Sequence, residues 1–160
     1  MAFNVQQFYS HISGKKDLAK KYNFELISGP FPMQCEMAEI PGKSFFTAEG
    51  RTYGPVYKVP YQSNFEPMNV SFLCTNIFDE RKYFEDWLGQ ITTNDFNYNY
   101  QPSYGKQLVF VQYDDAGKII CRVKLIDAWP VSVSPMELNW SSNTYHKLNV
   151  QLMYYRYELT

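Results

Sequence analysis

Short runs of alternating apolar and polar residues, each closed by a turn signal, recur along most of the chain. Residues 22–28 place Phe24 and Leu26 on one side of such a run, which stops at Gly29-Pro30. A period of two is the pattern of a half-buried β-strand. The same reading predicts further strands at residues 33–37, 53–59, 68–74, 108–113, 118–127 and 147–158.

One amphipathic helix is predicted among these strands, at residues 77–91. Its apolar stripe recurs at helical spacing and consists of Ile77, Phe84, Trp87, Leu88 and Ile91. Asn76 is a suitable N-cap, and the carboxylates of Asp79 and Glu80 suit the positive end of the helix dipole. We therefore expect a single helix that packs its aromatic face against a sheet.

The order of the elements predicts an all-β-dominated fold. Residues 114–117, Asp-Asp-Ala-Gly, separate two strands and supply a Gly for positive φ, which indicates a hairpin. Trp129-Pro130 is expected to end the second of these strands. The expected architecture is a β-sandwich or partly open barrel of two packed antiparallel sheets with one flanking helix. We expect a single domain, 1–160, in which residues 1–20 form an N-terminal arm.

Two adjacent aromatic residues stand out in a segment that the pattern predicts to be a loop. Phe45 and Phe46 lie side by side within residues 44–50, just after the Ile40-Pro41 corner. Adjacent side chains do not both face one core. Either this loop folds back as a flap, or the two rings meet a neighbouring subunit.

Composition favours surfaces that meet other proteins over surfaces that bind phosphates. Aromatic residues make up 18% of the chain, with 14 Tyr, 12 Phe and 3 Trp, and tyrosine is common on sheets and at interfaces. The net charge is −1, which lacks the positive excess that nucleic-acid-binding proteins use. Tight nucleic-acid binding is not expected, whereas passage of DNA through a pore built from such subunits is compatible with this charge.

The cysteines and the N-terminus are those expected of a soluble protein folded in a reducing compartment. Cys35, Cys74 and Cys121 are odd in number and far apart, so we expect free thiols. Residues 1–10 lack the basic start and apolar run of a signal peptide. No stretch approaches the about 20 apolar residues that span a bilayer, so we expect no membrane binding.

No constellation in the sequence argues for an enzyme. His11 and His146 have no Cys or His partner at metal-ligand spacing, and the nucleophile, phosphate-loop and zinc-helix motifs are missing. We expect no catalytic residue, no cofactor and no metal. The Tyr-rich segment 97–104 offers aromatic faces suited to stacking on sugars, so a carbohydrate-binding module is a remote alternative.

In the C-terminal third, the stretch AWPVSVSPMELNWSSNTYHKLNVQLMYYRYEL, residues 128–159, places Trp129-Pro130 after a strand, then Trp140, then a long final strand. This stretch resembles the ending of tail tube proteins from contractile-tailed bacteriophages. DLAKKYNFELISGPFPMQCEMAEIPG resembles the opening of that family, and NIFDERKYFEDWLGQI resembles its outer helix. The family is related to the inner tubes of contractile injection systems.

This resemblance implies a structural virion protein of the phage tail. In that family six copies close into a ring, rings stack into a hollow tube inside a contractile sheath, and viral DNA passes through the tube. The implied partners are further copies of the chain, the tail sheath protein, baseplate and neck proteins at the tube ends, and the tape measure protein and DNA transiently in the lumen. The implied location is the virion tail, assembled in the bacterial host cytoplasm.

The resemblance also assigns roles to particular residues. Inter-ring contacts are expected from Ile40, Pro41, Phe45 and Phe46. A sheath-facing helix surface is expected from Glu80, Lys82 and Glu85. Structural core and motif positions are expected at Phe84, Trp87, Trp129, Pro130 and Trp140.

Two further expectations concern the lumen and the exact role. Because the lumen must not hold DNA, its side chains are expected to be polar and neutral to acidic. The alternatives to a tube subunit are a baseplate or neck protein of the same fold that starts or ends the tube, and the inner tube of a contractile injection system.

Overall fold

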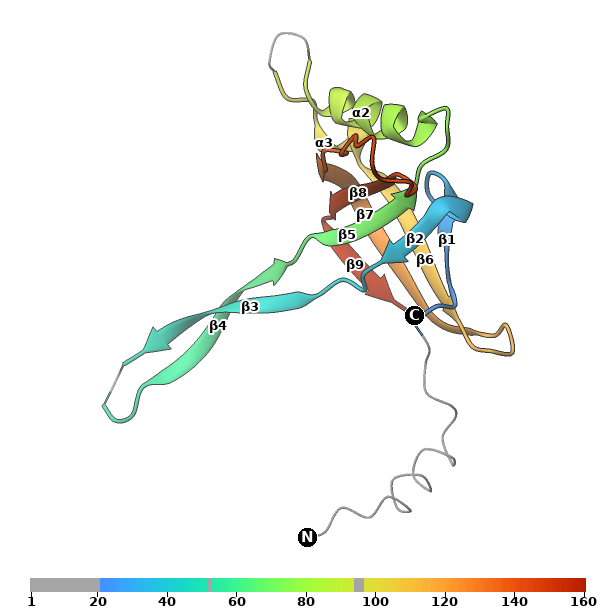
Figure 1. Ribbon diagram of the computed structural model, residues 1–160. Coiled ribbons are helices and arrows are strands. Elements are labelled where there is room, and N and C mark those ends of the chain that lie inside the picture. Colours follow the sequence, from blue (N-terminus) through green and yellow to red (C-terminus); the bar gives the residue numbers. More distant parts are fainter. Residues whose placement is uncertain (1–20, 52, 94–96) are drawn as a thin grey trace.

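The computed structural model describes residues 21–51, 53–93 and 97–160 (Figure 1). These residues form the predicted all-β-dominated fold. The strands are β1 (Phe24–Ser28), β2 (Cys35–Ala38), β3 (Lys43–Gly50), β4 (Tyr57–Phe65), β5 (Met68–Leu73), β6 (Lys106–Tyr113), β7 (Ile119–Val133), β8 (Lys147–Met153) and β9 (Arg156–Leu159). The helical segments are η1 (Pro32–Gln34), α2 (Asp79–Ile91) and α3 (Gln101–Tyr104).

Seven strands form one antiparallel sheet that folds over at β7 into two layers. The first layer contains β1, β6, the start of β7, and β9, in that order. The second layer contains the end of β7, then β8, β5 and β2. The remaining strands, β3 and β4, form a separate two-stranded ribbon.

Strand β7 belongs to both layers because its backbone bends at Asp127. The φ of Asp127 is 52°, in the left-handed region that Asp tolerates better than most residues. Up to Ala128 the strand pairs with β6 and β9, and from Trp129 it pairs with β8. The prediction that Trp129-Pro130 ends this strand is wrong, because the strand turns a corner and continues through Pro130 to Val133.

The last part of the chain turns the same corner. Residues 147–158 were expected to form one strand, but Tyr154 and Tyr155 separate β8 in the second layer from β9 in the first. The Tyr155 N–H donates to the carbonyl of Ile126 at 3.0 Å, which ties this turn to the bend in β7.

The hydrophobic core fills the space between the two layers. Inward-facing residues alternate along each strand, as their periodicity predicts. The buried apolar side chains are Leu26, Met68, Val70, Phe72, Phe84, Trp87, Leu108, Phe110, Val123, Leu125, Ala128, Leu148, Val150, Leu152 and Tyr154.

Helix α2 covers one end of the two layers and confirms the predicted helix, with a later start. It begins at Asp79 rather than residue 77, and its N-cap is Phe78 at φ 59° without a side-chain cap, not Asn76. Ile77 is therefore outside the helix and 62% exposed, whereas Phe84 and Trp87 are each 1% exposed. The indole N–H of Trp87 donates to the Tyr104 carbonyl at 2.7 Å, which joins α2 to α3.

Two segments between the strands differ from the expectation. The predicted loop 44–50 is strand β3, and the strand predicted at 53–59 begins only at Tyr57 and runs to Phe65. The Tyr-rich segment 97–104 contains the short helix α3.

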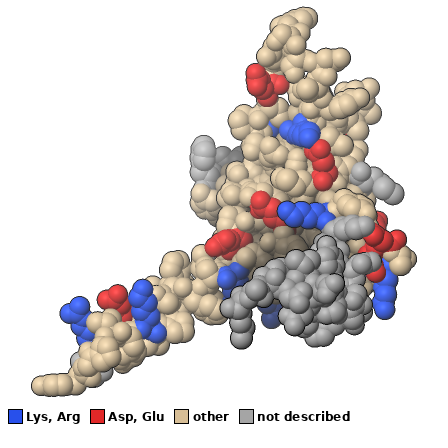
Figure 2. Space-filling model, turned by 60° about the horizontal axis from the view of Figure 1, so that its bottom comes forward, with Lys and Arg blue, Asp and Glu red and all other residues tan. Residues whose placement is uncertain are grey.

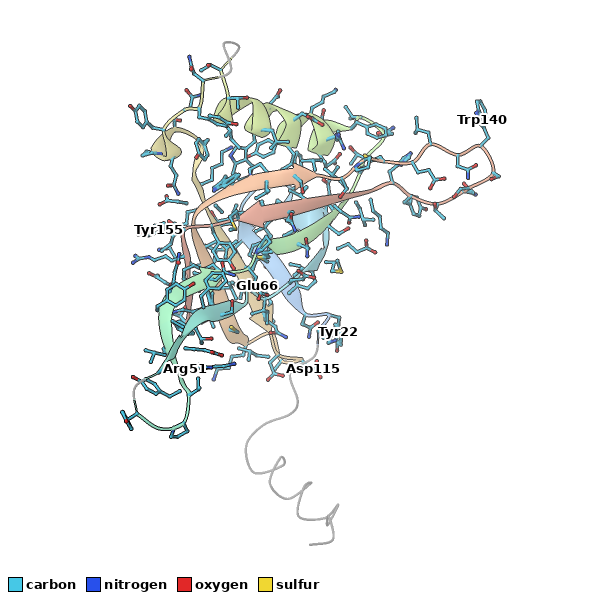
Figure 3. All side chains as sticks on the ribbon, turned by 90° about the vertical axis from the view of Figure 1, so that its left-hand side faces the viewer. Tyr22, Arg51, Glu66, Asp115, Trp140 and Tyr155 are labelled. Atoms are coloured by element: carbon cyan, nitrogen blue, oxygen red, sulfur yellow. The ribbon has the colours of Figure 1, made fainter. Side chains whose placement is uncertain are left out.

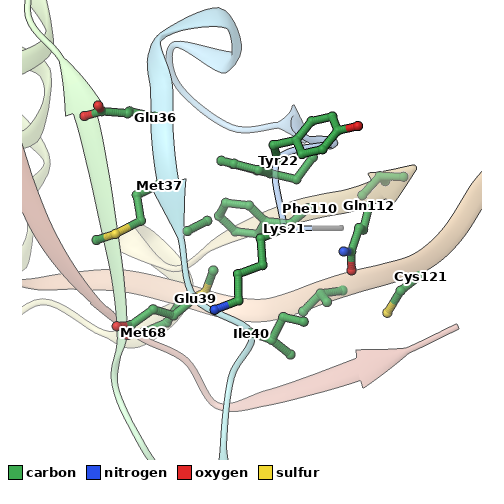
Figure 4. A pocket seen from close by; sticks show the side chains of 14 residues that line it. Lys21, Tyr22, Glu36, Met37, Glu39, Ile40, Met68, Phe110, Gln112 and Cys121 are labelled. Carbon is green, nitrogen blue, oxygen red and sulfur yellow. The ribbon is translucent and has the colours of Figure 1, made fainter. Parts of the chain in front are cut away.

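The two layers do not close on the side of β1 and β2, each of which pairs on one edge only among the described strands. A groove of about 740 Å³ lies there. Phe24 and Phe110 line it from the first layer, and Met37, Ile40 and Met68 from the second (Figure 4). The prediction of a partly open arrangement is confirmed.

The different positions of Phe84 and Ile77, which sequence periodicity placed on one stripe, give a test of the fold. We expect Phe84→Ala to lower the free energy of unfolding by about 3–5 kcal/mol, because it empties a fully buried site. Ile77→Ala should change it by no more than about 0.5 kcal/mol. Urea unfolding followed by circular dichroism measures both, and similar losses in the two variants would contradict this placement of the helix.

Candidate assembly interface

The ribbon of β3 and β4 projects away from the two layers (Figure 1). Its ladder runs from Lys43 opposite Phe65 to Gly50 opposite Tyr57, with one irregularity after Phe46. Within the described part of the chain, these strands pair only with each other. A lone two-stranded hairpin is at best marginally stable in water, so this one requires a further surface to pack on.

Apolar side chains lie along the exposed hairpin. Phe45 and Phe46 are adjacent in a strand, so their rings lie on opposite faces, and both stay exposed because neither face packs on the two layers. The rings of Phe46 and Tyr61 stack with centroids 6.3 Å apart. Tyr57 and Val59 are also exposed. Contiguous apolar surface of this kind is typical of protein–protein contacts.

Sequence reasoning missed the β4 half of this surface. Tyr57, Val59 and Tyr61 alternate with Lys58 and Pro60, which is the signal that could have identified the strand. The predicted strand at 53–59 instead began in the turn before β4 and ended before Tyr61, the last residue of the apolar alternation.

An aromatic cluster fixes the root of the hairpin. Phe65, Tyr154 and Tyr157 contact one another edge to face, with centroids 5.8 to 6.0 Å apart. The Tyr154 hydroxyl donates to the Glu66 carbonyl at 2.6 Å. The ammonium of Lys43 lies 5.6 Å from the centre of the Phe65 ring. The hairpin is thus held where the chain passes from the second layer to the first.

The four residues expected at the inter-ring contact do not share one environment. Phe45 and Phe46 are exposed on the hairpin, and Ile40 is exposed beside its root. Pro41 is buried, so its side chain is not available to another subunit, and its expected role as a contact is corrected here. A corner that joins β2 to β3 buries the Pro ring in the fold.

The expected outer surface of α2 contains two of its three predicted residues. The side chains of Lys82 and Glu85 are 68% and 49% exposed. Glu80 is 1% exposed and accepts hydrogen bonds from the N–H and hydroxyl of Thr75, both at 3.2 Å. Glu80 therefore stabilises the start of the helix, and the prediction that it faces a partner is wrong.

The motif residues divide between core and surface. Phe84, Trp87 and Pro130 are buried as expected. Trp129 is half-buried and its ring contacts Tyr104 edge to face at 6.1 Å. Trp140 is fully exposed on the β7–β8 loop, so its expected place in the core is wrong. Figure 3 shows it on a projection of its own.

The outward faces of the two layers differ in where their charged side chains lie. At the centre of the second layer Asn69 is opposite Gln151 and Ser71 opposite Asn149, a neutral polar row in which Ser71 is only 4% exposed. Charged groups border this row, where Glu39 accepts a hydrogen bond from the Asn69 amide and Lys147 pairs with Glu36. The first layer places charged pairs on its outward face, among them Lys124 beside Glu158. Figure 2 shows blue and red side chains intermixed over the body and the hairpin.

The described residues contain no group of three His, Cys, Asp or Glu side chains placed to hold a metal ion. The three cysteines are free thiols, as expected. Burial raises the pKa of Cys35 to about 11, so this thiol stays protonated and unreactive near neutral pH. Among the described helices, none is long and apolar enough to cross a membrane.

Comparison with protein families identifies the chain. The model of the family described as "Phage tail tube protein" matches residues 3–160. The chain belongs to the phage tail tube protein family. Members of this family are structural proteins and not enzymes. Among curated protein sequences, none matches this chain.

Solved structures share the fold at low sequence identity. A chain of the extracellular contractile injection system described as "PVC sheath/tube terminator in extended state" has a TM-score of 0.73 and 20% identity, covering 91% of this chain and 99% of that one. The tube terminating cap of the anti-feeding prophage has a TM-score of 0.72 and 18% identity, covering 91% and 92%. A chain of the structure described as "PVC sheath-tube complex in extended state" has a TM-score of 0.65 and 19% identity, covering 99% of this chain and 99% of that one.

The hairpin root gives a prediction about pH. Burial, followed by the nearby Tyr157 and Glu66, raises the pKa of Tyr154 to about 12, whereas a tyrosine in an unfolded chain titrates near about 10. Between these values the unfolded chain releases a proton that the folded protein keeps, so stability falls as pH rises from about 10 to about 12. Tyr154→Phe removes the hydrogen bond to the Glu66 carbonyl, so we expect its free energy of unfolding to be about 1 kcal/mol lower at neutral pH. Above about pH 10, the free energy of unfolding of this variant should fall less steeply with pH than that of the wild type.

Urea unfolding at pH 8 and pH 11 measures both effects. Tyr155→Phe is the matched control, because the neighbouring ring is exposed. If Tyr154→Phe loses as much stability between pH 8 and pH 11 as the wild type does, the raised pKa of Tyr154 is not a cause of that loss.

Proposed function

We propose that this chain is the subunit of a hollow tail tube, in which six copies close into a ring and rings stack inside a contractile sheath. The observation that carries the proposal is the β3–β4 hairpin, whose apolar residues on both faces have no cover in their own subunit. A tail tube protein with a projecting apolar ribbon is suited to repeated contact with copies of itself. Viral DNA is the proposed cargo of the tube.

Strand edges offer a means of closing the ring. In the second layer, β2 pairs only with β5, and residues 129–133 pair only with β8 among the described strands. Pairing of these two edges between neighbours would leave no open edge in the second layer, and open edges are what sheet proteins generally avoid. Six layers of four strands at about 4.8 Å per strand give a backbone circumference of about 115 Å, hence a radius of about 18 Å.

The outward face of the second layer is the proposed lumen wall. Its central exposed residues are the neutral Asn69, Asn149 and Gln151, and Ser132 continues the row onto β7. At its margins the base Lys147 is paired with Glu36, and Glu39 adds a further acid. Such a wall attracts a polyanion less than the first layer, where the bases Arg122, Lys124 and Arg156 outnumber the acids Glu25 and Glu158. This matches the expectation that the lumen must not hold DNA.

Electron microscopy of the purified protein tests the proposal. We expect rings and long hollow tubes, and a reconstruction in which Asn149 and Gln151 face the axis. Phe46→Ser with Val59→Ser should keep the fold but lose tubes, whereas Ile119→Ser, an exposed apolar position on β7, should assemble normally. A persistent monomer would overturn the tube proposal, and a reconstruction with Lys124 at the axis would overturn the lumen assignment.

A protein that starts or ends the tube is the second candidate, since solved chains described as terminator and cap share this fold. Copy number separates the two roles. A tube subunit is abundant in the particle, whereas an initiator or terminator is present as one ring or a few. The inner tube of an injection system that carries protein would differ in the cargo found in the lumen.

The exposed face of α2 is the proposed contact with the sheath protein. Lys82→Glu should weaken co-assembly with the sheath protein of the same particle and leave bare tubes intact, because the Lys82 side chain is 68% exposed and pairs with the exposed Asp79 of the same helix at 3.7 Å. Lys118→Glu, at the β6–β7 turn, is the control. Sedimentation of mixed sheath and tube proteins measures the effect, and failure of bare tubes to form would count against this surface.

A further inference from the structure

The β7–β8 loop and the hairpin lie at opposite ends of the second layer. In the ladder between β5 and β8, Met68 is opposite Leu152 and Leu73 is opposite Lys147. The hairpin enters β5 at Met68, and the loop of residues 134–146 enters β8 at Lys147. Figure 3 shows Arg51 of the hairpin and Trp140 of the loop on opposite sides of the body.

The loop presents large apolar side chains to solvent. Leu138, Trp140 and Tyr145 are each more than four-fifths exposed. Surfaces of this kind are rare on proteins that act alone, and Trp and Tyr are the usual anchors of protein interfaces. This loop therefore resembles an uncovered contact surface.

The base of this loop is fixed to the fold. The Ser134 N–H donates to the Asn149 carbonyl at 2.9 Å, and the Arg81 guanidinium donates to the Ser134 carbonyl at 2.7 Å. On the other side, the Cys74 N–H donates to the His146 carbonyl at 3.0 Å. Both ends of the loop are thus held against β8, β5 and α2, so its apolar tip has a defined place.

The tip of the 134–146 loop contains a groove, and its charge is opposite in sign to that of the hairpin. A groove of about 580 Å³ is lined by Glu137, Leu138, Trp140 and His146, together with short polar side chains. Glu137 is the one acidic or basic residue of segment 134–146, histidine aside. The hairpin carries Lys43, Arg51 and Lys58 against a single acid, Glu49 (Figure 2). A basic apolar ribbon and an acidic apolar groove are complementary.

We propose that the 134–146 loop receives the β3–β4 hairpin of a second copy of this chain in the next ring. The inference rests on the proposed function, and it names the surface on which the hairpin packs. Two different patches at opposite ends of one molecule bind head to tail, and this arrangement repeats without closing, as a stack requires. Trp140 and Leu138 contribute the apolar contact, and Glu137 faces the basic residues of the hairpin.

Substitution of Trp140 separates stacking from folding. We expect Trp140→Ala to unfold in urea like the wild type and to form rings, but to reduce the stacked fraction about tenfold or more, as truncation of an aromatic anchor does. Tyr98→Ala, which removes another largely exposed ring, 81% against 107% for Trp140, should stack normally. Sedimentation and electron microscopy measure the fraction. Normal stacking of Trp140→Ala overturns the proposal, and loss of rings or of the fold assigns Trp140 another role.

A disulfide test identifies the partner directly. In a background with Cys35, Cys74 and Cys121 replaced by Ala, Tyr57→Cys and Trp140→Cys subunits are mixed and oxidised. We expect a covalent dimer from the mixture, and none when Tyr57→Cys is mixed with Tyr98→Cys.

The two tests distinguish this inference from the proposed function. If the wild type forms tubes but the Tyr57→Cys and Trp140→Cys subunits do not cross-link, the hairpin–loop contact is overturned and the proposed tube function is unaffected. If the wild type forms neither rings nor tubes, the tube function fails, and the cross-link then decides whether the contact exists in another oligomer.

Discussion

A bend in one strand holds the two layers of this protein in a single body. β7 pairs with β6 and β9 up to Ala128 and with β8 from Trp129, so the angle between the layers is set within one continuous backbone. The turn at Tyr154 and Tyr155 lies beside that bend and is tied to it through Ile126. The hydroxyl of Tyr154 then holds the carbonyl of Glu66 at the root of the hairpin. The position of the projecting ribbon therefore depends on the geometry of the corner.

Periodicity in the sequence was sufficient for the elements that pack on their own core. The helix with Phe84 and Trp87, the strand at 68–74 and the hairpin turn at 114–117 are all found near their predicted places. Each of these has one buried face, which is what an alternating or helical pattern records.

The same reasoning failed where burial does not follow from local pattern. β3 was predicted to be a loop, and the adjacent Phe45 and Phe46 were noted as unusual within it. A strand exposed on both faces has no reason to alternate, so the pattern could not reveal it. The alternation of residues 147–158 continues through Tyr154, so it could not reveal the corner there. Glu80 looked like a surface residue, because a carboxylate buried against Thr75 leaves no trace in spacing. The exposure of Trp140 was hidden by the general tendency of Trp to be buried.

For the proposed tube, the exposed hairpin has a consequence for the kinetics of assembly. The hairpin becomes stable only when a neighbouring subunit covers it. The first subunits to associate lack that neighbour, so the ordering of their hairpins is not yet offset by burial. Starting a new tube is then slow, while adding a subunit to an existing end is favourable from the first contact. Growth governed in this way begins from a template, so the length of the product depends on where starting sites are provided and not on subunit concentration alone.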